Sequence, residues 1–324
     1  MKKCLSFFVA MMVVFSSHSQ AERLSDYPQK AIRLIVPYPP GGGTDIVVHA
    51  FRQRLTDSLS QPVVVDHRGG ATGVIGTTLV ARAPADGYTL LAHTNAGLVI
   101  VPQMLKKSPY DPLKDFAPIT LATSSPYILV VNPKLTVSSV AQLIEFAKAR
   151  PGAINYASSG NGSSTHLAGL LFNQLAGVLM VHIPYKGSAP AITDLIAGQV
   201  QTRFSSIPPA LPHVREGRLR ALAVTGAKRF FLLPDLPAVS ETLPGYMVDA
   251  WYGVLAPAGT PELIINLLNK QIVAALTVDA VRALLATEGA EVVASNPSYF
   301  SKTIEREYAQ WAPIIRRSGA TVNE

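Results

Sequence analysis

A strand-like apolar run followed by a glycine-rich loop and a helical pattern occurs twice in the chain. The first occurrence connects Ile32–Val36 to a helix over Thr44–Leu59 through a Pro-Pro-Gly-Gly-Gly loop. The second connects Ile154–Ala157 to an apolar helix through a loop of serines and glycines. Further strand–loop–helix units lie around both, which predicts an α/β fold with parallel strands and helices on both faces of the sheet. Ligands of such sheets bind in the loops beyond the carboxyl ends of the strands.

The first loop has the composition of an anion-binding site. The run Gly41-Gly42-Gly43 carries no side chains, so a ligand can approach its backbone closely. Thr44 or Asp45 is expected to cap the following helix, whose N–H groups and positive dipole end favour a carboxylate or a phosphate. Tyr38 is expected to form a wall of the site or to donate a hydrogen bond. The alternative is that the glycines only make a tight turn.

The second loop is rich in hydroxyl groups and precedes the N-terminus of a helix, which again favours an anion. Its candidate ligand-binding residues are Ser158, Gly160, Gly162, Ser163, Ser164, Thr165 and His166. The alternative is a flexible exposed loop, because serine, asparagine and glycine are common in such loops.

His166 follows the serines but does not complete a catalytic triad. A triad needs a base that is oriented by a third group, and the loop lacks the Gly-x-Ser-x-Gly sequence of a nucleophile elbow. His166 is therefore expected to brace the loop, and no catalytic residue is predicted.

Three more polar residues stand at predicted strand ends. Thr94 and Asn95 follow the strand-like run Tyr88–Ala92, and Ser205 follows Val200–Phe204. Because the carboxyl ends of parallel strands meet at one edge of a sheet, these residues are also candidates for the ligand site.

The N-terminus has the pattern of a secretory signal peptide over residues 1–21. Two lysines precede an apolar run that is too short to span a bilayer, and Ser19-Gln20-Ala21 is a typical cleavage site. Cleavage would remove Cys4, the only cysteine, and would lower the formal net charge of +7 by two. The mature chain is then expected to have no thiol chemistry, which suits an oxidising compartment.

Two lobes are predicted in the rest of the chain. One would be discontinuous and contain residues 22–125 and 226–324, and the other would contain residues 126–225. The strand-like runs Tyr127–Val131 and Arg220–Thr225 are expected to cross between them.

Other binding functions are disfavoured by the distribution of charged residues. The seven histidines are dispersed without metal-ligand spacing, and the basic residues form no run of four or more. We therefore expect no metal, no cofactor and no nucleic acid as a partner.

Taken in order, the motifs resemble those of one family, the Bug-type (TctC-like) solute-binding proteins of the tripartite tricarboxylate transporter systems. The matching segments are Tyr27-Pro28, Ile32–Pro37, Gly42–Asp45, Asp66–Ala71, Ile75-Gly76, Pro84–Leu91, Tyr110–Ile119, Ser159–Ser163, His166-Leu167, His182–Gly187, Leu219–Thr225 and Ala256–Pro261. Each motif alone is weak, but their order along the whole mature chain is specific.

The resemblance implies a type II periplasmic-binding-protein fold in which two α/β lobes close on a small carboxylate. It also implies a monomeric periplasmic receptor, not an enzyme, that delivers its ligand to the membrane permease subunits of a tripartite transporter. A receptor that reports its ligand to a sensor kinase is the alternative, and a periplasmic hydrolase is disfavoured.

The sequence departs from the family at Ser205, where many relatives carry aspartate. An aspartate could accept hydrogen bonds from a ligand ammonium group, whereas serine is neutral. The departure predicts a preference for plain organic anions over amino acids.

Overall fold

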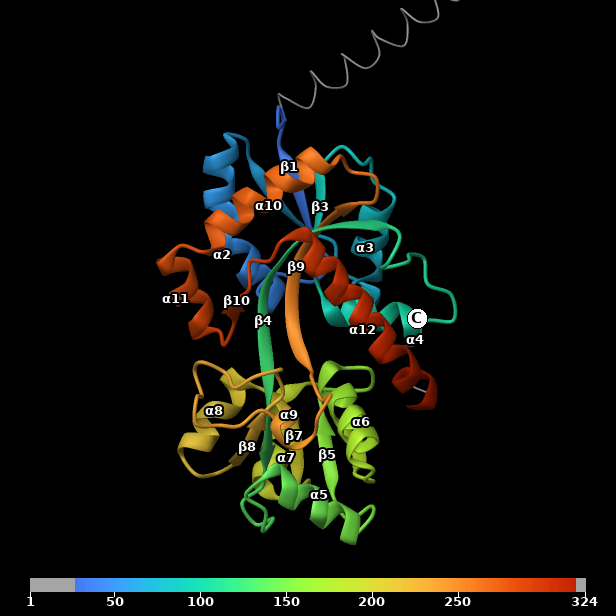
Figure 1. Ribbon diagram of the computed structural model, residues 1–324, viewed down its shortest axis with the longest axis vertical. Coiled ribbons are helices and arrows are strands. Elements are labelled where there is room, and N and C mark those ends of the chain that lie inside the picture. Colours follow the sequence, from blue (N-terminus) through green and yellow to red (C-terminus); the bar gives the residue numbers. More distant parts are fainter. Residues whose placement is uncertain (1–26, 319–324) are drawn as a thin grey trace, which may run out of the picture.

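The computed structural model describes residues 27–318, so the predicted signal peptide lies outside the described residues. The chain forms two α/β lobes that lie one above the other in Figure 1. Two long strands, β4 (Phe116–Val131) and β9 (Asp249–Pro257), run between them. This is the two-lobe architecture that the sequence predicts.

The first lobe contains the strand order β2-β1-β3-β9-β4, with a short strand β10 paired to β4. Its further strands are β1 (Ile32–Val36), β2 (Val63–His67), β3 (Thr89–Thr94) and β10 (Glu291–Val292). Its helices are α2 (Gly43–Leu59), η1 (Ala71–Gly73), α3 (Val74–Ala81), η2 (Ala96–Ile100), α4 (Val101–Met104), α10 (Glu262–Leu276), α11 (Asp279–Thr287) and α12 (Pro297–Ser318).

The second lobe continues the sheet from β4 in the order β4-β7-β5-β6, and β8 also pairs with β4. Its strands are β5 (Asn155–Ser158), β6 (Val181–Pro184), β7 (Thr202–Ser206) and β8 (Arg220–Val224). Its helices are α5 (Val140–Ala149), α6 (Ser164–Ala176), α7 (Ser188–Ala197), α8 (Ile207–Arg215) and α9 (Val239–Thr242).

The sheet is mixed, which corrects the expectation of a parallel one. β1 pairs in parallel with β2 and β3, and β5 pairs in parallel with β6 and β7. The strands at the junction, β4 and β9, are antiparallel to each other and to β7 and β3. Each parallel group therefore provides strand ends for a site, and an antiparallel pair connects the groups.

The connection between the lobes also differs from the prediction. β8 pairs with β4 over Ile128–Val131, the last four residues of β4, and lies within the second lobe. The chain returns to the first lobe through residues 225–248 and β9, whose ladder with β4 begins at the pair Pro126–Asp249. The predicted run Tyr127–Val131 pairs with β7 and β8, and it is the second-lobe end of a strand that begins at Phe116 in the first lobe.

Helix α12 connects the lobes along one face. Its buried residues Phe300, Ile304, Trp311 and Ile314 recur at helical spacing and form a single apolar stripe. The helix packs on β4 and reaches α6 of the second lobe, and its core cluster contains residues of both lobes. The other face of the first sheet is covered by α2, α10 and α11, which form a separate core cluster.

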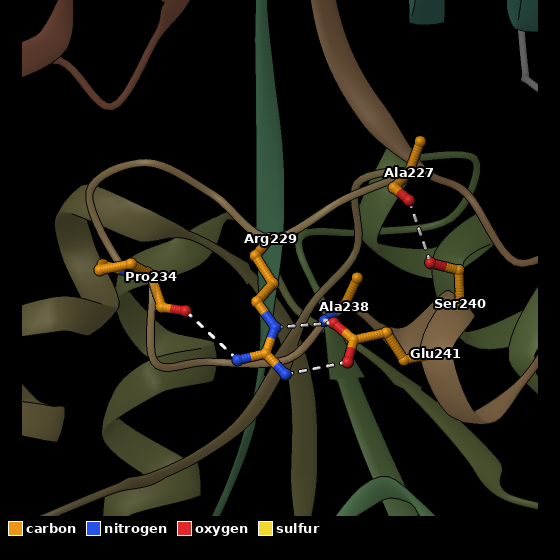
Figure 2. A network of polar contacts seen from close by, with 6 residues as sticks. All are labelled: Ala227, Arg229, Pro234, Ala238, Ser240 and Glu241. Carbon is orange, nitrogen blue, oxygen red and sulfur yellow. Dashed lines mark hydrogen bonds and ion pairs between the residues drawn. The ribbon is translucent and has the colours of Figure 1, made fainter.

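The returning segment is held by an exposed ion pair, which Figure 2 shows. The Arg229 guanidinium donates to both carboxylate oxygens of Glu241, at 2.9 and 3.0 Å. Glu241 also accepts from the N–H of Ala238, and the hydroxyl of Ser240 donates to the carbonyl of Ala227. These contacts close the segment into a compact loop before the chain re-enters the sheet.

Among residues 27–318, no single helix is long and apolar enough to cross a membrane. Only α10 and α11 together would meet that criterion, and they bend by 74° at their junction.

Candidate functional site

The first candidate loop leads from β1 into α2. The helix begins after Gly42, and no side chain within the described residues caps its N-terminus. Residues Gly41-Gly42-Gly43 are exposed, and Gly41 has a φ of 83°, a conformation that favours glycine. The N–H groups of the first helical turn have no partner within the helix, so this end of α2 can receive an anion.

Asp45 holds the loop in shape and is not the cap that the sequence suggested. Its Oδ2 accepts from the N–H of Gly41 at 2.8 Å, and its Oδ1 lies 2.8 Å from His67 Nε2 and 3.2 Å from His49 Nε2. Burial raises the pKa of this carboxyl, but hydrogen bonds from Gly41 and His67 outweigh it and lower the net value. Thr44 is buried beside it and provides no cap either.

Tyr38 and Thr94 lie next to this loop in one hydrogen-bonded chain. The hydroxyl of Tyr38 lies 3.0 Å from Thr94 Oγ1 and 3.3 Å from His93 Nδ1, and His93 Nε2 lies 2.8 Å from Thr77 Oγ1. Burial lowers the pKa of His93 to about 3, so its ring is neutral. Since Thr77 donates its hydroxyl proton to Gly73, Nε2 of His93 carries the ring proton and Nδ1 accepts from Tyr38.

Asn95 connects two strands of the first lobe through its side chain. Its side-chain amide donates to the carbonyl of Asp249 at 2.6 Å, and its oxygen accepts from the N–H of Ala96. The residue is buried. Asn95 therefore joins the end of β3 to the start of β9, and both ends of its side chain are already engaged.

The second candidate loop leads from β5 into α6, at the carboxyl end of its strand as predicted. Ser163 caps α6 by accepting from the N–H of His166, and its hydroxyl lies 2.7 Å from the carbonyl of Gly160. Gly160 and Gly162 have φ values of 127° and 75°, which explains the glycines. Thr165 accepts from the N–H of Ser159, so most of the loop's hydroxyl groups fix its own shape.

The side chains of His166 and His182 stabilise this loop. His166 Nδ1 accepts from the N–H of Gly162 at 3.2 Å, and its ring stacks on His182 with centroids 3.8 Å apart. His182 Nε2 lies 2.6 Å from the hydroxyl of Ser158. Burial lowers the pKa of both histidines to about 4, so two neutral rings are stacked at neutral pH. His166 thus has the bracing position that the sequence analysis expected.

Two tyrosines from the connecting strands contact the two loops, and sequence reasoning missed both. The hydroxyl of Tyr252 on β9 lies against Gly43. Burial raises the pKa of Tyr127 on β4, and the nearby side chain of Ser164 lowers it. Tyr252 pairs with Thr123, four residues before Tyr127 on β4. At about 3.3 Å per strand residue and about 5 Å between strands, the two tyrosine Cα atoms are roughly 14 Å apart. Both residues lie inside apolar strand patterns that gave no functional signal.

Ser205 lies at the carboxyl end of β7 and is fully buried. Its hydroxyl has no hydrogen-bond partner within residues 27–318. The predicted residues therefore fall into a group around α2 and β3 in one lobe and a group around α6 and β7 in the other.

Comparison with known proteins gives one consistent family. The profile described as "Tripartite tricarboxylate transporter family receptor" matches residues 47–320. The chain is 41% identical to protein BugT of Bordetella pertussis over 296 residues, which cover 91% of each chain.

Solved structures resemble the chain over nearly its whole described length. A Rhodopseudomonas palustris protein solved with adipate is 36% identical, with a TM-score of 0.72, over 91% of this chain and 99% of that one. MatC from Rhodopseudomonas palustris, solved with bound malate, is 31% identical, with a TM-score of 0.70, over 89% of this chain and 100% of that one.

Proposed function

Because the chain belongs to the receptor family of the tripartite tricarboxylate transporters, we propose that it binds a small organic carboxylate between its two lobes. The observation that carries this proposal is the N-terminus of α2, which follows three exposed glycines and has no side-chain cap among the described residues. A carboxylate would accept hydrogen bonds from N–H groups that the chain itself leaves open. Adipate and malate, bound to two relatives, are both dicarboxylates.

Lobe closure would complete the site. We take residues 22–125 and 226–324 as one lobe and residues 126–225 as the other, except that the returning segment 226–248 with α9 packs on the second lobe. The α2 loop and the α6 loop are then the opposing surfaces. Closing would place the ligand near both helix N-termini and remove it from water, which strengthens charge-assisted hydrogen bonds. Tyr127 and Tyr252 would then form the wall between the two loops.

The family supports a proposal for the biological role. The mature protein would work in the periplasm as a monomer and deliver its ligand to the membrane subunits of a permease. A sensory role, in which the loaded receptor contacts a sensor kinase, uses the same binding site and is the second candidate. No step in either role changes the ligand chemically.

A calorimetric titration of the purified mature protein tests the proposal. The panel contains succinate, malate, adipate, hexanoate, aspartate and glutamate, and a thermal-shift measurement runs beside it because a ligand that binds only the folded state raises the Tm. We expect at least one carboxylate to bind and to raise the Tm. Binding of aspartate or glutamate in preference to the plain dicarboxylates would contradict the interpretation of Ser205. No binding across the panel would contradict the carboxylate proposal itself.

A further inference from the structure

A fully buried arginine lies beneath the second candidate loop. Arg203 is on β7, and its side chain has no exposed surface. Its Nη2 donates to the hydroxyl oxygens of Ser159 and Ser188, each at 2.9 Å. These two oxygens are 3.1 Å apart. The guanidinium thus sits under a pair of hydroxyl groups that come from the α6 loop and from the start of α7.

Within the described residues, no anionic group neutralises the charge of Arg203. No carboxylate within residues 27–318 pairs with it, and its Nε and Nη1 have no hydrogen-bond partner there. Burial lowers its pKa to about 10, so the group remains protonated at neutral pH. A buried cation without an anion is costly, and a guanidinium has five N–H donors to satisfy.

The surroundings of Arg203 favour an anion as well. Ser188 is the first residue of α7, a ten-residue helix, so the guanidinium lies at the positive end of that helix dipole. Ser205 follows two positions later on β7 and therefore points to the same face of the strand. Its buried hydroxyl also lacks a partner among the described residues. The Arg203 cation, the N-terminus of α7 and the Ser205 hydroxyl would therefore all be stabilised by the same kind of group, an anion.

The two covering hydroxyl groups can extend the positive charge toward a ligand. Ser159 and Ser188 are only half-buried, whereas Arg203 beneath them is fully buried. A serine oxygen that accepts from a guanidinium keeps its own proton for donation. One of the two hydroxyl protons can form the hydrogen bond between Ser159 and Ser188. The other hydroxyl proton can be donated to a ligand acceptor.

We propose that Arg203, acting with Ser159, Ser188 and Ser205, binds the second carboxylate of a dicarboxylate ligand. This inference rests on the proposed function, in which the first carboxylate occupies the open N-terminus of α2. It assigns the ligand class, because a monocarboxylate would leave the buried cation without an anion. The contrasting interpretation is that Arg203 only fastens β7 to α7.

Calorimetric titration of matched acids separates these interpretations. Adipate and hexanoate have the same six-carbon chain and differ in one carboxylate, as do succinate and butyrate. In the wild type we expect the dicarboxylate of a pair to bind at least 30-fold more tightly. Arg203→Met should lose this preference by at least tenfold and keep the affinity for the monocarboxylate within threefold. Arg218→Met is the matched control, because Arg218 is an exposed arginine of the same lobe, and it should change neither affinity.

Stability and a second variant complete the test. If Arg203 binds an anion and is unpaired without ligand, Arg203→Met should leave the ligand-free Tm unchanged or raise it. If Arg203 instead stabilises the contact between β7 and α7, the same variant should lower the Tm by several degrees. Ser205→Ala, a small change that the fold can accept, should weaken the dicarboxylate alone by about threefold to tenfold. Equal binding of both acids by the wild type would overturn the inference and leave carboxylate binding intact. An unchanged preference in Arg203→Met would overturn it too, whereas no binding of any acid by the wild type would overturn the proposed function.

Discussion

The hydroxyl group of Tyr252 lies against the backbone of Gly43, the first residue of α2. A Cβ added at Gly43 would overlap with the phenol and would lie 2.8 Å from its Cζ atom. The N-terminus of α2 is therefore positioned by Tyr252 of β9, a residue about two hundred positions later in the chain. Gly43 is needed for this packing, whatever ligand binds in front of it.

Gly43→Ala should destabilise the protein. Overpacking costs about 1–3 kcal/mol, which corresponds to a Tm loss of about 2–5 °C for a chain of this size. Gly42→Ala is the matched control, since its Cβ would meet only the carbonyl of Pro39 at 3.8 Å. Its Tm should change by less than about 2 °C. Equal Tm losses in the two variants, measured by calorimetry, would contradict the role of Tyr252.

Gly42→Asp should separate the stability of α2 from ligand binding. Aspartate is a preferred capping residue, so the variant should keep or raise the ligand-free Tm, by up to about 1 kcal/mol of stability. The new carboxylate would occupy the N–H groups that we assign to the ligand and would repel an anion. We therefore expect carboxylate affinity to fall more than 100-fold in a calorimetric titration.

A distant glycine controls for the added charge. Gly245→Asp introduces the same group at an exposed position where nothing lies within 4 Å of the new Cβ. Its affinity should match the wild type. Full affinity in Gly42→Asp would place the ligand away from α2.

Acidification should loosen the α6 loop through His166. The pKa of His166 is about 4 in the folded protein, below the ordinary value of 6.5, so the unfolded chain binds more protons between these values. Stability is therefore lost as the pH falls from about 6.5 toward 4. His166→Asn offers an oxygen to the N–H of Gly162 and does not titrate, so its Tm should fall less over that interval. An equal fall in the Tm of His166→Asn and of the wild type would contradict this role of His166.

Glu307 should give the opposite pH dependence. It lines a pocket of about 420 Å³ at the junction of the lobes, where burial raises its pKa from 4.5 to about 8 although Trp251 Nε1 donates to it at 2.8 Å. The folded state holds the proton longer, so stability falls as the pH rises from about 4.5 to 8. Glu307→Gln keeps an oxygen for Trp251 and should be several degrees more stable than the wild type at pH 8.5.

An exposed neighbour on the same helix provides the comparison for Glu307. Glu305→Gln should show the Tm profile of the wild type, because that side chain is exposed. A profile for Glu307→Gln that parallels the wild type from pH 5 to pH 9 would mean that Glu307 is ionised in the folded protein.

The local parts of this structure could be predicted from the sequence. The two strand–loop–helix units, β1 with α2 and β5 with α6, were recognisable because an apolar run, a glycine loop and a helical pattern are neighbours in the chain. The long strand β4 was missed in part because Pro118 and Pro126 interrupt its pattern. Both prolines nevertheless lie in its ladder with β9, which shifts register after Pro118. A proline can remain in a ladder at such an irregularity.

The surroundings of the two loops could not be predicted, because they depend on distant pairings. Tyr252 and Tyr127 meet the loops only after β9 and β4 pair at the junction of the lobes. Arg203 is the single charged residue of β7, and only the fold shows that no carboxylate within residues 27–318 pairs with it. Asp45 gave a misleading signal, since a residue of capping type can also bond backward to Gly41.

The length of β4 has a mechanical consequence. Its sixteen residues belong to both lobes, and its antiparallel partner β9 starts beside Pro126. Any change in the angle between the lobes must therefore bend these two strands together as one ribbon. A ligand that holds the lobes closed would work against the elastic resistance of this ribbon. We expect ligand residence time to depend on the stiffness of the ribbon as well as on ligand contacts, so a substitution there could change the rate of release and leave the binding surface untouched.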